Sequence, residues 1–247
     1  MAGHSKWKNI QHRKGAQDAK RGKVFTKLIK EITVAVKTGG GPDAESNPRL
    51  RLALQNAKGV NMPKDLSERA IKKGSGEGGE NFIEITFEGY GPDGVAIFVE
   101  CATDNNTRTV ANIRSYFNKY NGSLGKDGCL QFLFDRKGIF ILPTGEIEEE
   151  DFTMEMIDAG AEDVEFEDGE ITVTTAMEDF GAVQKKFVEL SITPQEASLQ
   201  RIPNLTKKIE EKSFLTFMKL LDAIENDDDV QKVYHNVEYD EDLINKV

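Results

Sequence analysis

The chain has 247 residues, of which 38% are hydrophobic and 30% charged, and its formal net charge is −11. This length allows one large domain or two to three small ones. The sequence contains no run of 18 apolar residues, which is about the length that a helix needs to span a bilayer. The N-terminus lacks the apolar core of a secretory signal, and two cysteines without a Cys-x-x-Cys spacing are typical of a reducing compartment. The sequence therefore predicts a cytoplasmic protein with no membrane segment.

The charges are unevenly distributed along the chain. Residues 1–75 hold 17 Lys and Arg against 6 Asp and Glu, whereas the remainder holds 15 against 37. This division favours a basic module that binds a polyanion, together with acidic modules that the same polyanion would repel. The alternative is that the two parts neutralise each other within one fold.

The basic excess is concentrated at the N-terminus. Residues 1–16 show no helical period and predict an extended arm, and a helix is expected from about Ala19 to the Gly-rich stretch 38–42. One face of this helix is apolar, formed by Val24, Phe25, Leu28, Ile29, Ile32 and Val36. The opposite face gathers Ala16, Lys20, Lys23, Lys27 and Lys30, and we expect this basic stripe to be open to solvent or to a partner.

Two further short helices are expected, over 47–59 and from about 62 to 74, each with one apolar stripe. Together with the first helix they predict a helical domain over residues 1–77. The Gly-rich run that follows, 74–79, has the letters of a dinucleotide-binding motif. It follows a helix and precedes a strand, which is the reverse of what that motif requires, so we interpret it as a linker.

The pattern then changes to alternating strands. Residues 82–88 and 95–101 predict a hairpin around a Gly-Pro-Asp-Gly turn, followed by a helix over 107–120 and a strand over 128–134. A second set follows in the order β-α-β-β-α-β, which is the ferredoxin-like pattern. Its segments are strand 138–142, helix 147–159, a hairpin of 164–167 and 171–175 around Asp168-Gly169, helix 178–190 and strand 195–201.

A last helix over about 207–225 and a last strand over about 230–237 complete the chain. The first set, β-β-α-β, lacks a last helix and strand, and these two C-terminal elements would supply them. The predicted fold is therefore an α+β multidomain protein: a basic helical domain (1–77), a middle α/β domain in two segments (80–134 and 204–247), and a ferredoxin-like acidic domain inserted between them (135–203). A simple linear series of domains is the alternative.

Catalytic and metal-binding patterns are scarce. The three histidines, His4, His12 and His235, have too few nearby acids to build a metal site, and no compact nucleophile and base are found. The acidic runs 148–151 and 227–229 lack calcium-loop spacing and predict solvated surface. The segment 104–108, Asp-Asn-Asn-Thr-Arg, is either a specific polar cluster or a helix cap. We therefore expect no enzyme activity, no cofactor, no metal and no small-molecule substrate. The alternative is an enzyme whose acid and base are brought together only by the fold of the α/β domains.

The basic N-terminus is the remaining candidate site. Lys and Arg neutralise phosphates, Trp7 can stack on a base, and His12 and Arg13 can stack on or hydrogen-bond to unpaired RNA. The alternative is a solvated basic helix with a disordered tail. The predicted nucleic-acid-binding residues are His4, Lys6, Trp7, Lys8, His12, Arg13, Lys14, Lys20, Arg21, Lys23, Lys27 and Lys30.

The same stretch resembles the opening signature of the YebC/PmpR family. The resemblance rests on Gly3-His-Ser-Lys-Trp7 and Phe25-Thr-Lys-Leu-Ile-Lys-Glu-Ile32, among other N-terminal residues. It continues through Tyr90-Gly-Pro-Asp-Gly94 and Thr103-Asp-Asn-Asn-Thr-Arg108, and covers essentially the whole chain.

The resemblance implies three domains, one helical and two α/β, and no enzyme activity. It also implies one of two roles: a regulator that binds promoter DNA, or a ribosome-associated translation factor that contacts rRNA. Bacterial members of the family are described as helping synthesis through proline-rich stretches, and mitochondrial relatives as activating translation of a respiratory-chain subunit. Because the motif begins at Met1, we expect a bacterial, cytoplasmic member. The sequence leaves open whether RNA or DNA is the target.

Overall fold

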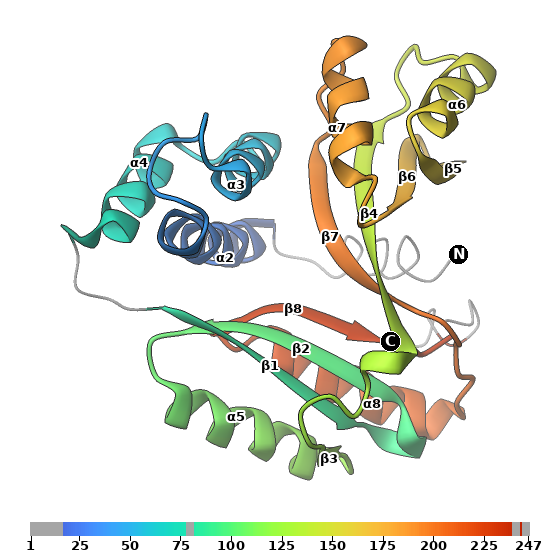
Figure 1. Ribbon diagram of the computed structural model, residues 1–247. Helices are drawn as coiled ribbons and strands as arrows, with labels where there is room; N and C mark the ends of the chain where they lie inside the picture. The colour runs from blue at the N-terminus through green and yellow to red at the C-terminus, as the bar shows by residue number, and fades with distance from the viewer. Residues whose placement is uncertain (1–16, 78–81, 239–242, 244–247) are drawn as a thin grey trace. The chain divides into compact units, whose positions relative to one another are not determined.

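The structure, a computed structural model, describes residues 17–77, 82–238 and 243 (Figure 1). These residues form helices α2 to α8 and two four-stranded antiparallel sheets, so the predicted mixed α and β class is confirmed. Close backbone contacts divide the chain into two units. The first comprises Met1–Val34, Gly78–Phe134 and Pro203–Val247, and the second Ala35–Glu77 and Asp135–Ile202.

The sheet of the first unit has the strand order β3-β1-β2-β8. Its strands are β1 (Ile83–Tyr90), β2 (Ala96–Thr103), β3 (Ser123–Leu124) and β8 (Val230–His235). The hairpin of β1 and β2 was predicted, and its register pairs Ile83 with Thr103 and Tyr90 with Ala96. Strand β8 pairs with β2, so this sheet combines two stretches of chain that are far apart in sequence.

Two helices, α5 (Asn106–Lys119) and α8 (Glu211–Glu225), pack on one face of this sheet (Figure 1). Side chains of a strand point alternately to its two faces. On β2, Ile97, Val99 and Cys101 therefore face the helices, where Phe117, Phe214 and Phe217 complete the core. The alternate residues Ala96 and Phe98 pack on the other face with Leu130, Phe134 and Tyr234.

The predicted strand 128–134 is wrong. This stretch is a turn and a 3-10 helix (Gln131–Leu133), and strand β4 begins only at Phe134. The reason is the buried carboxylate of Glu88, which accepts hydrogen bonds from the backbone N–H groups of Gly128 (2.8 Å) and Leu130. These two donors are thereby used by a side chain instead of a neighbouring strand, although the apolar sequence resembles a strand.

The second sheet has the order β5-β6-β4-β7. Its strands are β4 (Phe134–Pro143), β5 (Ala161–Glu167), β6 (Glu170–Ala176) and β7 (Glu196–Pro203), and its helices are α6 (Glu149–Asp158) and α7 (Phe180–Glu189). The element order is therefore β-α-β-β-α-β, that of the ferredoxin-like pattern. The predicted Asp168-Gly169 hairpin is confirmed: both residues have left-handed backbone (φ 51° and 81°), as a type I′ turn requires.

The first part of the chain contains three helices, as predicted: α2 (Gln17–Thr38), α3 (Pro48–Gly59) and α4 (Lys64–Lys72). A short π-helical turn (Lys73–Glu77) follows α4. Asn47 begins α3: its side chain accepts a hydrogen bond from the Leu50 N–H (3.0 Å) and donates to the carbonyls of Ala35 and Gly41 (2.8 Å each). This one amide therefore joins the end of α2 to the start of α3.

Within the second unit, α3 contacts the edge strand β7. The side-chain amide of Asn56 exchanges two hydrogen bonds of 2.9 Å with the backbone of Ala197, in the manner of a neighbouring strand. At Gly59 the approach is so close that an added Cβ would lie 2.0 Å from the carbonyl oxygen of Gln195. The helix therefore occupies an edge that would otherwise present unpaired backbone groups.

Candidate nucleic-acid interface and the adjoining polar depression

The predicted nucleic-acid-binding residues fall into three groups in the structure. His4, Lys6, Trp7, Lys8, His12, Arg13 and Lys14 lie outside the described residues. Lys20 and Arg21 lie in the first turns of α2, but the structure does not describe their side chains. Lys23, Lys27 and Lys30 follow on the same helix and are described.

Lys23, Lys27 and Lys30 differ sharply in exposure. Lys23 is exposed, and its ammonium donates a hydrogen bond to the side-chain oxygen of Asn226. Lys27 is half-buried. Burial lowers the pKa of its ammonium, and the negative charge of Glu225 opposes that effect. The stripe of α2 is therefore open at Lys23 and becomes progressively covered toward its C-terminal end.

The expectation that Lys30 lies open to solvent or a partner is wrong. The residue is 8% exposed, and its ammonium donates to Asp229 Oδ1 (2.9 Å) and to the carbonyls of Asp228 (2.7 Å) and Ala102 (3.2 Å). An ammonium has three protons, and these three acceptors use all of them. Lys30 therefore ties α2 to the end of β2 and to the turn 228–229, and it has no donor left for a phosphate.

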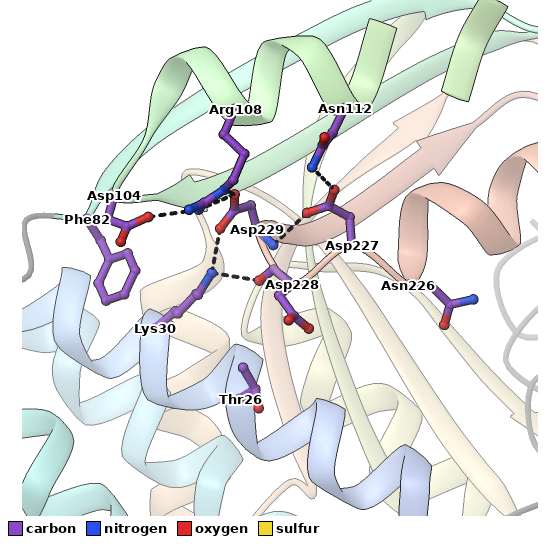
Figure 2. Close-up of a pocket in the computed structure, with 10 residues that line it drawn as sticks. All are labelled: Thr26, Lys30, Phe82, Asp104, Arg108, Asn112, Asn226, Asp227, Asp228 and Asp229. Carbon is purple, nitrogen blue, oxygen red and sulfur yellow. Dashed lines mark hydrogen bonds and ion pairs between the residues drawn. The ribbon is translucent and has the colours of Figure 1, made fainter. Parts of the chain in front are cut away.

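Asp229 is the centre of this cluster (Figure 2). Asp229 is only 3% exposed. Its second carboxylate oxygen, Oδ2, accepts hydrogen bonds from the Arg108 guanidinium (2.7 Å) and from the hydroxyls of Thr109 (2.9 Å) and Thr103 (3.1 Å). Burial alone would raise the pKa of this carboxyl. Hydrogen bonds from Lys30, Arg108 and Thr109 outweigh that effect and lower the pKa to about 2. Asp229 is therefore a buried, ionised carboxylate with matched partners.

The segment 104–108 fits both of the interpretations that the sequence left open. Asn105 caps α5, because its side chain accepts from the Arg108 N–H (3.1 Å). Arg108 also forms ion pairs with Asp104 (2.8 Å) and Asp229 (2.7 Å), which raise the pKa of its guanidinium. The motif thus starts a helix and orients a cation toward Asp229.

The acidic run 227–229 was predicted to be solvated surface, and this prediction is wrong for Asp229. Asp229 is buried, and the carboxylate of Asp227 accepts from Asn112 and Tyr116 (3.0 Å each) and from the Asp229 N–H (2.9 Å). Burial and the hydrogen bond to Asp227 raise the pKa of the Tyr116 hydroxyl to about 12. Only Asp228 has an exposed side chain. One weak signal of this role was present in the sequence, because the run directly precedes the last predicted strand.

An open depression of about 620 Å³ lies over this cluster. Thr26 and Lys30 of α2 form one side of it, Phe82, Asp104 and Arg108 another, and the turn 226–229 a third (Figure 2). The carboxylates of Asp104, Asp227 and Asp229, which face it, are paired with cations or hydrogen-bond donors. Among the described residues no three His, Cys, Asp or Glu side chains are placed to hold a metal ion. The arrangement joins α2, the end of β2, the start of α5 and the turn before β8.

Known proteins resemble the chain along almost its entire length. The family described as "TACO1/YebC protein N-terminal domain" matches residues 5–77, and "TACO1/YebC second and third domain" matches residues 82–237. The chain belongs to the TACO1/YebC family. The predicted family membership is therefore confirmed, and the Lys30–Asp229 cluster joins a residue of the first matched region to residues of the second.

Relatives of high identity carry regulatory names. A "probable transcriptional regulatory protein" of Amoebophilus asiaticus is 53% identical over 96% of this chain and 98% of its own length. One of Syntrophotalea carbinolica with the same name is 56% identical, over 96% and 95%. The crystal structure of a conserved hypothetical protein from Aquifex aeolicus is similar with a TM-score of 0.82 at 44% identity, covering 90% of this chain and 91% of the other.

None of the described helices is long and apolar enough to cross a membrane.

Proposed function

We propose that this protein is a non-enzymatic, nucleic-acid-binding regulator of gene expression. In our proposal it acts as a translation factor on the ribosome, contacts rRNA through its basic N-terminus and assists synthesis of proline-rich stretches. The observation that carries the proposal is the charge of residues 1–30, with nine Lys and Arg against one acid in a chain whose net charge is −11. The regulatory names of the relatives support the broader role.

The proposed interface is smaller than the sequence alone suggested. It comprises the cations of the N-terminal segment and of the first turns of α2, with Lys23 as its exposed described member and Lys27 at its margin. Lys30 is left out, since Asp229 and two carbonyls use its protons. We also propose the three-domain division of the sequence, with the acidic ferredoxin-like domain (135–203) inserted into the middle one.

RNA is the preferred target because of how the other helices use their cations. A DNA-reading helix-turn-helix would need a second helix with free donors for base edges. In α4 two of the cations pair with acids of the same helix, Arg69 with Asp65 (3.2 Å) and Lys64 with Glu68 (3.6 Å). A basic segment with Trp and His among its cations instead suits the irregular, unstacked bases of RNA.

A charge reversal tests the interface. Replacing Lys8, Arg13, Lys14, Arg21 and Lys27 with Glu should abolish binding to ribosomes, because the release of counterions by these cations drives such binding. The matched control reverses five exposed lysines elsewhere: Lys64, Lys72, Lys185, Lys208 and Lys212. The control changes the net charge equally and should retain binding. Equal loss in both variants would reject a localised interface, and unfolding of the first would show that the stripe is structural.

The second candidate function is a DNA-binding transcriptional regulator, favoured by the printed names of the relatives. In-cell crosslinking followed by sequencing of the attached nucleic acid separates the two. Reads concentrated on rRNA, with poorer translation of a proline-rich reporter after gene deletion, would support the ribosomal role. Reads concentrated on promoters, with a high ratio of specific to non-specific affinity on the same sites, would replace it with the transcriptional one.

A further inference from the structure

Helix α6 exposes two large apolar side chains on the face turned away from its own core. Phe152 and Met156 point inward and are buried, whereas Met154 and Ile157 are 62% and 52% exposed. Residues three apart are neighbours on a helix surface, so Met154 and Ile157 form one continuous apolar spot. Methionine is a flexible, polarisable side chain that is frequent where a surface must adapt to a partner.

Carboxylates surround this spot. Glu150, Asp151 and Asp158 lie four before, three before and four after Met154, and all three are exposed. Lys186 of α7 pairs with Glu155 and also attracts Asp158, whereas Glu150 and Asp151 form no ion pair or hydrogen bond among the residues that the structure describes. Asp158 is also in the last turn of α6, where the helix dipole favours a cation, and that turn contains no basic residue. The surface is therefore not arranged for the stability of the helix itself.

The neighbouring helix α7 provides the contrast. Val188 is even more exposed (73%), but the charges around it are balanced, since Lys185 pairs with Glu189 at 3.7 Å along the same helix. An isolated exposed apolar residue of this kind is ordinary. The feature particular to α6 is an apolar centre inside a rim that is net negative, with Lys186 as the one described cation beside it.

The wider surroundings exclude a nucleic-acid ligand for this face. Residues 135–203 contain 18 Asp and Glu against 5 Lys and Arg, so phosphates are repelled. The complementary occupant is a protein segment that brings apolar side chains and several cations on one side, as basic amphipathic helices do. Such a segment would cover Met154 and Ile157, and its cations would reach the carboxylates at the rim.

We propose that the outward face of α6 is a docking site for a Lys- and Arg-rich amphipathic segment of another protein. Met154 and Ile157 form its apolar centre, and Glu150, Asp151 and Asp158 select the charge of the partner. This site is separate from the proposed nucleic-acid interface and does not depend on it.

Binding of a defined probe gives the first test. The probe is a fluorescently labelled 18-residue helical peptide of Leu and Lys in an amphipathic pattern, titrated with the full chain. The combined change Glu150→Gln, Asp151→Asn and Asp158→Asn should weaken binding about tenfold, since each exposed pair contributes modestly. The matched control neutralises three other exposed acids, Glu146, Glu178 and Glu210, and should weaken it less than twofold. Equal weakening in both would overturn the proposal.

Photo-crosslinking in cells gives the second test. The photo-reactive residue p-benzoylphenylalanine replaces Met154 in one variant and Val188 in the other, and the crosslinked peptides are sequenced. We expect net-basic protein segments at position 154 in at least fivefold excess over position 188, and loss of that excess when the three rim acids are neutralised. Crosslinks to nucleic acid, to segments without basic residues, or equally from both positions would overturn the proposal.

Discussion

Lys23 and Lys30 are two helical turns apart on α2, and in sequence they belong to the same stripe. Their surroundings are nevertheless opposite, since one is exposed and the other is used entirely by Asp229 and two carbonyls. Sequence periodicity could predict the stripe, because that depends on local spacing. It could not predict the burial of Lys30, because the partner is 199 positions further along the chain.

The ionised state of Asp229 predicts a specific sensitivity to acid. Its pKa in the folded protein is about 2, below the ordinary value of 3.8, so the ionised carboxylate stabilises the fold at higher pH. This contribution is complete above about pH 4 and is lost as the pH falls toward 2. Asp229→Asn should therefore lower the free energy of unfolding at pH 7 by about 3 kcal/mol, because it leaves Lys30 buried without its counter-charge.

Urea denaturation from pH 7 to 2 measures both effects. The difference between the wild type and Asp229→Asn should shrink as the pH falls. Asp228→Asn is the control, since the side chain of Asp228 is exposed, and it should change stability by less than about 0.5 kcal/mol. A difference that stays constant down to pH 2 would contradict an ionised Asp229.

At the scale of elements, the contact of α3 with β7 depends on one glycine. Gly59→Ala would place a methyl group 2.0 Å from the backbone carbonyl oxygen of Gln195, the residue just before β7. A backbone carbonyl cannot move aside as a flexible side chain can. We expect a loss of about 1–3 kcal/mol in the free energy of unfolding. Gly22→Ala is the matched change in α2, where no described atom lies within 4 Å of an added Cβ, and it should stabilise the protein by about 0.5–1 kcal/mol. Equal effects of the two, measured by thermal denaturation, would exclude a close contact at Gly59.

Element prediction succeeded where the signal was local and failed where it was not. The Asp168-Gly169 hairpin was predictable because its turn residues directly determine the backbone. The stretch 128–134 was not, because the buried side chain of Glu88 uses its backbone donors and lies 40 positions away from Gly128. The short strand β3 was missed as well, since two residues are too few to show alternation.

At the scale of the whole molecule, the proposed insertion can be tested by excision. The N–H of Asn204 donates to the carbonyl of Leu133 at 2.9 Å, so the chain leaves and re-enters the first unit at adjacent points. Removing residues 136–201 and joining the ends with two glycines should leave the β3-β1-β2-β8 sheet intact. The shortened chain should unfold cooperatively in urea with β-sheet circular dichroism. A chain without a cooperative transition would show that the sheet needs the inserted residues.

The charge division of the sequence has a clear meaning at this scale. The acidic residues 135–203 form a sheet and two helices with a core of their own, and the basic excess lies in residues 1–75. Composition alone could predict that such modules exist. It could not predict that Lys30, counted among the basic residues, and Asp229, counted among the acidic ones, share one buried ion pair.

The pairing of β8 with β2 also has a consequence for synthesis of the chain. About half of the sequence separates Thr103, the end of β2, from Val230, the start of β8. At ~5–20 residues per second, β2 waits roughly 6–25 s for its partner, with an apolar edge that could pair with other nascent chains. The intervening β-α-β-β-α-β unit can fold during that interval. The order of translation thus completes the inserted sheet first and the sheet that surrounds it in sequence last.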